Sequence, residues 1–266
     1  MELFNEYGTL LIILAGLFGF FMAWGVGAND VANAMGSSVG SKALTIKQAI
    51  LIAMVFEFAG AYLAGGEVTS TIRKGIVDTD VFVDSPDLLV YGMLSALLAA
   101  GTWLMIASFK GWPVSTTHSI VGAIVGFAAV GVSTDAVNWS KVSTIVASWV
   151  VSPVIAGTIS FAIFRSVQNL ILIQDDPFER AKKYAPMYMF AVGFLMAMVT
   201  ILKGLKHVFK DIGVSLNFGE SIVWAIMFGV FVAIIGSFLL ARVERDEALE
   251  ATNRFANVVR VFGVLM

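Results

Sequence analysis

The sequence predicts an all-α protein, a polytopic bundle of transmembrane helices, and three observations carry this prediction. Of its 266 residues, 58% are hydrophobic and only 14% are charged, whereas an average soluble domain has about 25% charged residues. The mean hydropathy is +0.87. Apolar stretches that reach the roughly 17–25 residues needed to cross a bilayer as a helix recur along the chain. A soluble globular protein is therefore excluded, and the lipid bilayer is the expected surrounding.

The apolar stretches give the order of the helices. Spanning helices are predicted within residues 9–24, 46–65, 88–109, 142–164, 187–202 and 221–241. The stretch 113–132 is also long enough, which gives about seven membrane segments, but it opens with a polar cluster. It is therefore either a further span or a re-entrant hairpin. We expect the first helix to be broken at Gly25 and Gly27, because glycine tolerates the backbone conformations that a break requires.

Residues 1–241 are thus predicted to form one transmembrane domain, followed by two different segments. Acidic and basic residues alternate over 242–257, which is typical of a charged, solvated cytoplasmic linker. Residues 258–266 become apolar again, and we expect them to begin a further membrane helix that is cut short, in a chain that is a fragment. The Lys and Arg residues favour an N-terminus outside and a multi-pass protein of the cell inner (plasma) membrane.

Composition excludes several kinds of chemistry. The chain has no cysteine, so disulfides, thiolate metal sites and cysteine nucleophiles are ruled out. No block of basic residues points to nucleic acid. No nucleotide-binding loop of the GlyXaaXaaXaaXaaGlyLys type is present, which argues against a primary pump. No cofactor is predicted.

The first polar motif, Gly-Ala-Asn-Asp-Val-Ala-Asn-Ala at 27–34, follows directly on an apolar stretch. On a helix, Asn29 shares a face with Asn33, and so does Asp30. Their oxygens suit a hard cation, and their amide groups can donate to an oxyanion. The alternative is that the asparagines only cross-link neighbouring helices. Beside a glycine break at membrane depth, a ligand role is favoured.

The second polar motif is Pro-Val-Ser-Thr-Thr-His-Ser at 113–119. Proline suits the first turn of a helix, and the free N–H groups that follow it form an anion-binding end. The hydroxyl groups of this turn add neutral donors, which suit a site that must release its anion. The alternative is ordinary capping by serine or threonine. His118 could donate to the anion or carry a proton, although a lone histidine is often structural.

Glu57 lies in the middle of the second predicted span, within Phe-Glu-Phe-Ala-Gly. An intramembrane carboxylate is a candidate cation ligand or proton carrier. The alternative is a protonated glutamate that bonds to a neighbouring helix.

At these motifs the chain resembles the PiT family of inorganic phosphate transporters. The segment 27–34 matches the most characteristic motif of the family, and 113–119 matches its second motif. The run Thr-Ile-Arg-Lys-Gly-Ile at 71–76, followed by Asp78, and Glu57 in its context are similar to the sodium-coupled members. The likeness extends over most of the chain.

The resemblance implies a symporter that moves inorganic phosphate together with sodium, and not an enzyme. It implies a fold of two inverted-topology halves, of which this chain would hold one half and adjoining helices. By position, the phosphate site would include Asn29, Asn33, Ser115, Thr116, Thr117 and His118. The sodium site would include Asp30, Asn33, Glu57 and Ser119.

The chain departs from the family pattern because each motif occurs once, whereas the family carries two copies. Either the chain is a fragment, which we favour, or a homodimer completes the site. Other functions also stay open: proton coupling through Glu57 and His118, sulfate as substrate, or a sensor that binds phosphate without moving it. An intramembrane enzyme that uses Ser115 or Ser119 with His118 is disfavoured, because the motifs of serine hydrolases and zinc proteases are missing.

Overall fold

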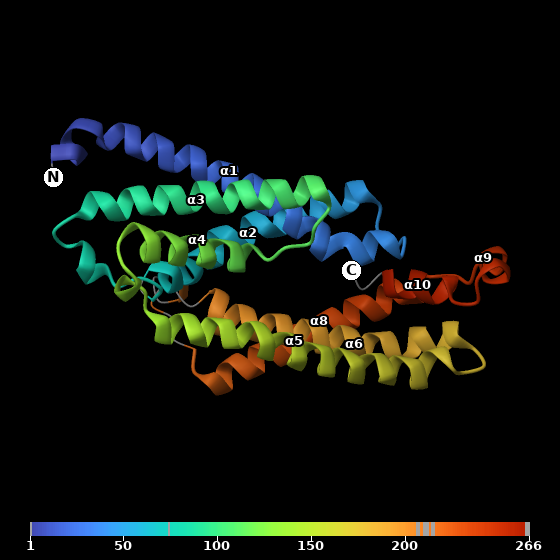
Figure 1. Ribbon diagram of the computed structural model, residues 1–266. Helices are drawn as coiled ribbons and strands as arrows, with labels where there is room; N and C mark the ends of the chain where they lie inside the picture. The colour runs from blue at the N-terminus through green and yellow to red at the C-terminus, as the bar shows by residue number, and fades with distance from the viewer. Residues whose placement is uncertain (1, 74, 206–207, 210–212, 214–215, 264–266) are drawn as a thin grey trace. The chain divides into compact units, whose positions relative to one another are not determined.

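The computed structural model describes residues 2–73, 75–205, 208–209, 213 and 216–263, and within them the chain is helical (Figure 1). The α-helices are α1 (Glu2–Gly40), α2 (Ile46–Arg73), α3 (Pro86–Lys110), α4 (Thr116–Gly131), α5 (Trp139–Val167), α6 (Pro177–Val199), α8 (Phe218–Ala241), α9 (Glu247–Thr252) and α10 (Ala256–Gly263). Short 3-10 helices, η1 (Thr79–Phe82) and η2 (Thr134–Ala136), and π-helical turns, η3 (Gln168–Leu172) and η4 (Thr200–Gly204), extend or connect them. Among the described residues there is no strand, only an isolated bridge between Val77 and Val137.

The predicted membrane segments are confirmed as helices. Within the described part of the chain, 6 helices are long and apolar enough to cross a bilayer: α1, α2, α3, α5, α6 and α8, the last turns of α5 and α6 being π-helical. The segment 113–132 differs, because its helix α4 has only 16 residues. At 1.5 Å per residue such a helix is about 24 Å long, which is short of a hydrocarbon core of about 30 Å.

The predicted break in the first helix is wrong. Helix α1 runs for 39 residues through both Gly25 and Gly27 without interruption. Gly25 instead permits close packing, because a Cβ atom placed there would lie 3.0 Å from the Leu104 Cβ atom of α3. Gly101 of α3 has the reciprocal role, since its Cβ would lie 2.8 Å from the ring of Phe21. Close approach of backbones through small residues is a usual way to pack membrane helices.

The chain forms two compact units, which we describe separately. Unit 1 comprises Met1–Gly36 and Thr69–Val151, and unit 2 comprises Ser37–Val68 and Ser152–Met266. In unit 1, α3 and α4 lie side by side (Figure 1). Their contact includes Gly92, which leaves room for the ring of Phe127. The hydrophobic core of unit 1 consists of Ile76, Val77, Phe82, Ala96, Ala100, Ile120, Val121, Ile124, Ala128, Val137 and Val142.

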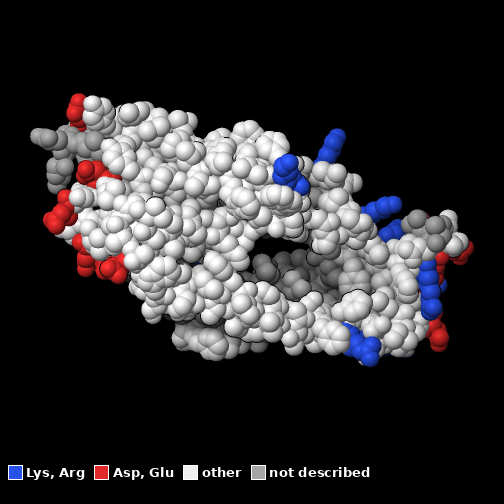
Figure 2. Space-filling model, in the orientation of Figure 1, with Lys and Arg blue, Asp and Glu red and all other residues white. Residues whose placement is uncertain are grey.

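The exposed acidic side chains of unit 1 gather at one end. Figure 2 shows acidic residues at the end where α1 and α3 begin, whereas the visible face of the helices beyond it is almost uncharged. Asp78, Asp80 and Asp84 are exposed there. This separation is what a membrane-spanning bundle requires, because charges are costly in the hydrocarbon layer and stable at its edges.

In unit 2 the main contact is between α6 and α8. A Cβ atom at Gly193 of α6 would lie 3.3 Å from the Cα atom of Gly229 in α8, and Gly236 of α8 accommodates the side chain of Met189. The predicted linker 242–257 contains the short helix α9 and the first two residues of α10. Buried Val258 and Val261 of α10 pack into the same core as α6. Whether 258–266 begins a membrane helix stays a prediction, and residues 264–266 lie outside the described part of the chain.

Candidate functional site

The two polar motifs meet inside unit 1, and Asn29 of α1 makes the first connection. Asn29 is only 5% exposed. Its amide nitrogen donates to the carbonyl oxygen of Trp112 at 3.0 Å, and its amide oxygen accepts from the backbone N–H of Val114 at 3.4 Å. The same oxygen accepts from the side chain of Asn33 at 3.0 Å. The predicted pairing of Asn29 with Asn33 on one helix face is therefore confirmed, and Asn29 in addition fixes the loop before α4.

Asp30 makes the second connection between the motifs. The Thr116 hydroxyl donates to Oδ2 of Asp30 at 2.8 Å, and both side chains are half-buried. A hydrogen bond to a carboxylate is roughly twice as strong as one between neutral groups. Neither residue is paired with a basic side chain among the described residues. The described hydrogen-bond partner of the carboxylate is thus a neutral donor.

The N-terminus of α4 forms the anion-binding side of the cluster. Ser115 is the N-cap, and its hydroxyl oxygen accepts from the backbone N–H of His118 at 3.3 Å. The Ser119 hydroxyl donates to the Ser115 carbonyl at 2.8 Å, which leaves the lone pairs of Ser119 available to a cation. Capping and ligand binding therefore do not exclude each other: the cap positions the turn, while the Ser115 proton remains free to be donated.

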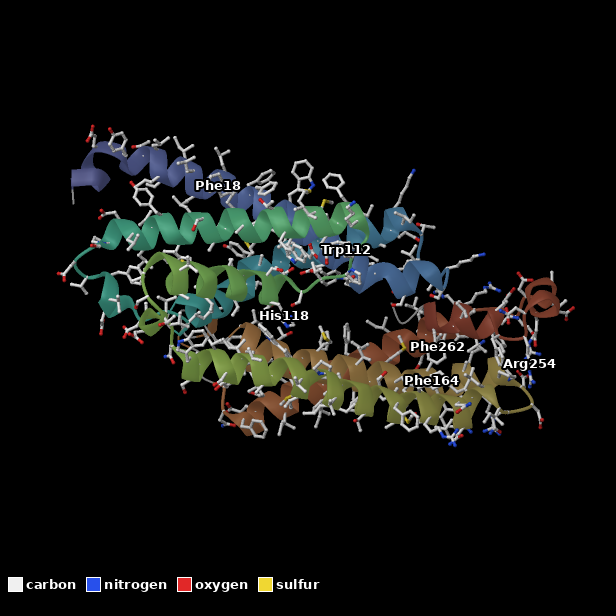
Figure 3. All side chains as sticks on the ribbon, in the orientation of Figure 1. Phe18, Trp112, His118, Phe164, Arg254 and Phe262 are labelled. Atoms are coloured by element: carbon white, nitrogen blue, oxygen red, sulfur yellow. The ribbon has the colours of Figure 1, made fainter. Side chains whose placement is uncertain are left out.

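A surface groove of about 410 Å³ opens beside this turn. Its lining is contributed by Trp103, Pro113, Val114, Ser115, His118 and Ser119. The rings of Trp103 and Trp112 lie 6.3 Å apart, centroid to centroid. Figure 3 shows Trp112 after the end of α3 and His118 in the first turn of α4. The second motif thus borders a space open to small solutes.

The predicted site residues are divided between the two units. In unit 1, hydrogen bonds join six of them in three pairs: Asn33 with Asn29, Thr116 with Asp30, and Ser119 with Ser115. Thr117 and His118 belong to the same turn with exposed side chains. Glu57 lies on α2 in unit 2, with an exposed side chain.

Two tryptophans at the site were not predicted. Trp112 contributes a backbone carbonyl to Asn29, and Trp149 of α5 contacts the ring of His118. Trp112 stands directly before Pro113 in the sequence, so its proximity to the motif was a usable signal. For Trp149 the sequence offers none, because its contact depends on how α4 and α5 pack.

The fold and the cluster together define a class: a multi-pass helical membrane protein with donors for an oxyanion beside a carboxylate. Comparison with known proteins identifies the family. The model of the phosphate transporter family matches residues 26–266, so the chain belongs to this family.

Individual relatives agree with the family. The chain is 48% identical over 271 residues to a protein of Haemophilus influenzae named "Putative phosphate permease", covering 100% of this chain and 62% of the relative. It is 50% identical over 185 residues to a chloroplastic inorganic phosphate transporter of Arabidopsis thaliana, covering 70% of this chain and 30% of the relative. A solved structure titled as the sodium-dependent phosphate transporter matches with a TM-score of 0.78 and 35% identity, over 96% of this chain and 66% of that one.

These comparisons confirm the predicted family, the all-helical transporter fold and the multi-pass membrane location. The family and its named members are transporters and permeases, not enzymes, as predicted. The chain spans less than two thirds of the length of these relatives.

Proposed function

We propose that the protein is a secondary transporter that carries inorganic phosphate across a membrane together with sodium. The observation that carries the proposal is the hydrogen bond from Thr116 to Asp30, which joins the two polar motifs. Through it, a helix N-terminus suited to an oxyanion lies beside a carboxylate suited to a hard cation. The family membership supports phosphate as the substrate.

The anion side has neutral donors throughout. Phosphate would bind at the first turn of α4 through its free N–H groups, the hydroxyls of Ser115, Thr116 and Thr117, and the ring of His118, with amide groups from Asn29 and Asn33. The positive end of the helix dipole, about half a unit charge, favours the anion. Because no Lys or Arg among the described residues is bonded to these groups, phosphate would be held without a fixed cation and could be released on the other side of the membrane.

The cation side explains why transport would require sodium. A phosphate bound near Asp30 would be repelled by its carboxylate, by about 4 kcal/mol for two unit charges 4 Å apart at an effective dielectric constant of 20. A sodium ion on Asp30, with oxygens of Asn33 and Ser119, removes this repulsion. We assign Glu57 a supporting role in cation binding or transport on the basis of the family resemblance.

Thr116 is suited to couple the two ligands. Its hydroxyl has one proton, which Asp30 accepts in this structure. A sodium ion on Asp30 would attract the hydroxyl oxygen and leave the proton free for phosphate. Sodium binding would thereby add a donor to the phosphate site.

Asp30 also favours phosphate over sulfate. At neutral pH phosphate carries at least one O–H group, which an ionised carboxylate can accept, whereas sulfate has only acceptor oxygens. A sulfate oxygen and a carboxylate oxygen of Asp30 would face each other with no proton between them. This unfavourable contact would select against sulfate.

The donors described here belong to one side of a site, and the family resemblance implies a second set of residues. We propose that a second half of the protein, or a second copy in a homodimer, supplies them, in the inner membrane of the cell.

Uptake of radiolabelled phosphate by vesicles that contain the full-length protein tests the proposal. We expect uptake to require an inward sodium gradient and to resist excess sulfate. Uptake driven by a pH gradient without sodium would favour the proton-coupled alternative. Phosphate binding without any uptake would indicate a sensor instead.

A further inference from the structure

Trp149 of α5 lies against the imidazole of His118, and the established features of the site do not account for this contact. The ring centroids are 3.8 Å apart and the ring planes are inclined by 33°. Trp149 is itself half-buried and packs against the hydrophobic core of unit 1. The indole therefore contacts both the core of unit 1 and the ring of His118.

Apart from Trp149, the His118 ring has no hydrogen-bonded or aromatic ring partner among the described residues. The backbone N–H of His118 donates to the Ser115 side chain, which is the N-cap of α4. The ring nitrogens of His118 make no hydrogen bond to a described residue. The side chain is exposed and lines the groove beside Ser115 and Ser119. An imidazole whose face packs on an aromatic ring and whose edge is free can donate to a ligand from a fixed position, since every protonation state has at least one N–H group.

We propose that Trp149 is the positioning residue for His118 in the phosphate site: it packs on one face of the imidazole and directs a ring N–H group into the groove at the N-terminus of α4. This inference rests on the proposed function and goes beyond it by assigning a role to a residue on α5, outside both motifs. Fixing a donor before the ligand arrives reduces the conformational entropy that binding must remove.

The test is a double-mutant cycle in the full-length protein, with the half-saturating phosphate concentration for sodium-driven uptake as the readout. H118A should raise it roughly tenfold, the size expected for a lost hydrogen bond to a charged group. W149L should raise it about threefold to tenfold in the wild type but have almost no effect in H118A, because the two residues act as a unit. W149F keeps an aromatic face and should restore most of the affinity.

The control is Trp139→Leu, the same substitution near the start of the same helix, where the indole donates to the Thr134 carbonyl outside the groove. It should leave the half-saturating concentration unchanged. Equal effects of W149L with and without His118, or no effect in the wild type, would overturn the proposal. If wild-type protein shows no sodium-driven uptake, the proposed function itself fails, which is a different result.

A second measurement does not depend on the folding of W149L. In wild-type protein labelled with ¹³C-histidine, the His118 ring signals, assigned by their loss in H118A, should move when inorganic phosphate and sodium are added. In W149F they should move by a similar amount. His118 signals that do not respond to phosphate would also overturn the proposal.

Discussion

Two aspartates, Asp30 within α1 of unit 1 and Asp176 at the start of α6 in unit 2, have opposite surroundings. Asp30 accepts a hydrogen bond from the neutral hydroxyl of Thr116. Asp176 is the N-cap of α6, where it accepts from the backbone N–H of Glu179 and forms an ion pair with Arg245. The Arg245 guanidinium, through its hydrogen bonds, holds the pKa of Asp176 below its usual value. One carboxylate is thus paired with a basic side chain, whereas the other has a neutral hydroxyl as its described partner.

The segment around Arg245 shows what a purely structural polar cluster looks like. Asn257, only 1% exposed, exchanges hydrogen bonds with the backbone of Asp246 and donates to Glu250. Lys182 of α6 donates to the carbonyl of Val243. Figure 3 places Arg254 beyond α9, and this side chain donates to the carbonyl of Gln174. These contacts, with the Asp176–Arg245 ion pair, connect the segment that follows α8 to α6 and to the turn before it.

The largest expected effect on phosphate uptake comes from removing the carboxylate of Asp30, which has no basic partner among the described residues. Asp30→Asn keeps the acceptor for Thr116 but not the charge, so sodium-driven phosphate uptake should fall on the order of a hundredfold. The matched change Asp176→Asn should leave uptake and its sodium activation close to wild type. Equal losses in both variants would remove the distinction between the two carboxylates.

Next in size is the loss of the shared hydroxyl. Thr116→Val preserves shape and removes the proton, so the half-saturating concentrations of both phosphate and sodium should rise, by roughly tenfold for phosphate. Thr116→Ser, which retains the hydroxyl, is the control and should remain near wild type. A rise for phosphate alone would place Thr116 in the anion site without a coupling role.

A smaller effect is expected at Glu57. The carboxylate belongs to unit 2 and its side chain is exposed, so Glu57→Gln should lower sodium-driven uptake by only about fivefold through the loss of one charge. The measurement is the initial uptake rate at saturating phosphate over a series of sodium concentrations. Unchanged rates at every sodium concentration would show that Glu57 is a packing residue.

The smallest effect concerns stability and belongs to the other aspartate. Because the pKa of Asp176 is lowered in the folded protein, its stabilisation is complete above the ordinary value of 3.8 and is lost as the pH falls through the folded value. Asp176→Asn should therefore lower the melting temperature slightly at neutral pH and not at strongly acidic pH. Arg245→Gln should behave in the same way, and a shift that is equal at every pH would contradict the ion-pair explanation.

The sequence predicted the helices well because their signal is local. Long apolar segments must satisfy their backbone groups internally, so each became a helix at the expected place. The break at Gly25 was predicted wrongly because local sequence does not show distant contacts. Glycine permits a break in a helix, but here it makes room for Leu104, which belongs to a helix far along the sequence. Helix periodicity also predicted the pairing of Asn29 with Asn33.

The connection between the motifs was not available from residue spacing. Asp30 and Thr116 meet because α3 and the loop after it return the second motif to α1, and only the family resemblance placed both in one site. The role of Asn257 was hidden as well, since the charged composition of 242–257 is equally typical of a solvated linker and of a segment that packs on α6.

The most direct test of the account is phosphate binding to the purified full-length protein in sodium and in potassium, compared between wild type and Asp30→Asn. If the carboxylate is reserved for a mobile cation, wild type binds phosphate tightly only in sodium, and Asp30→Asn binds equally in both salts. An Asp30→Asn protein that still requires sodium for tight binding would contradict the central claim.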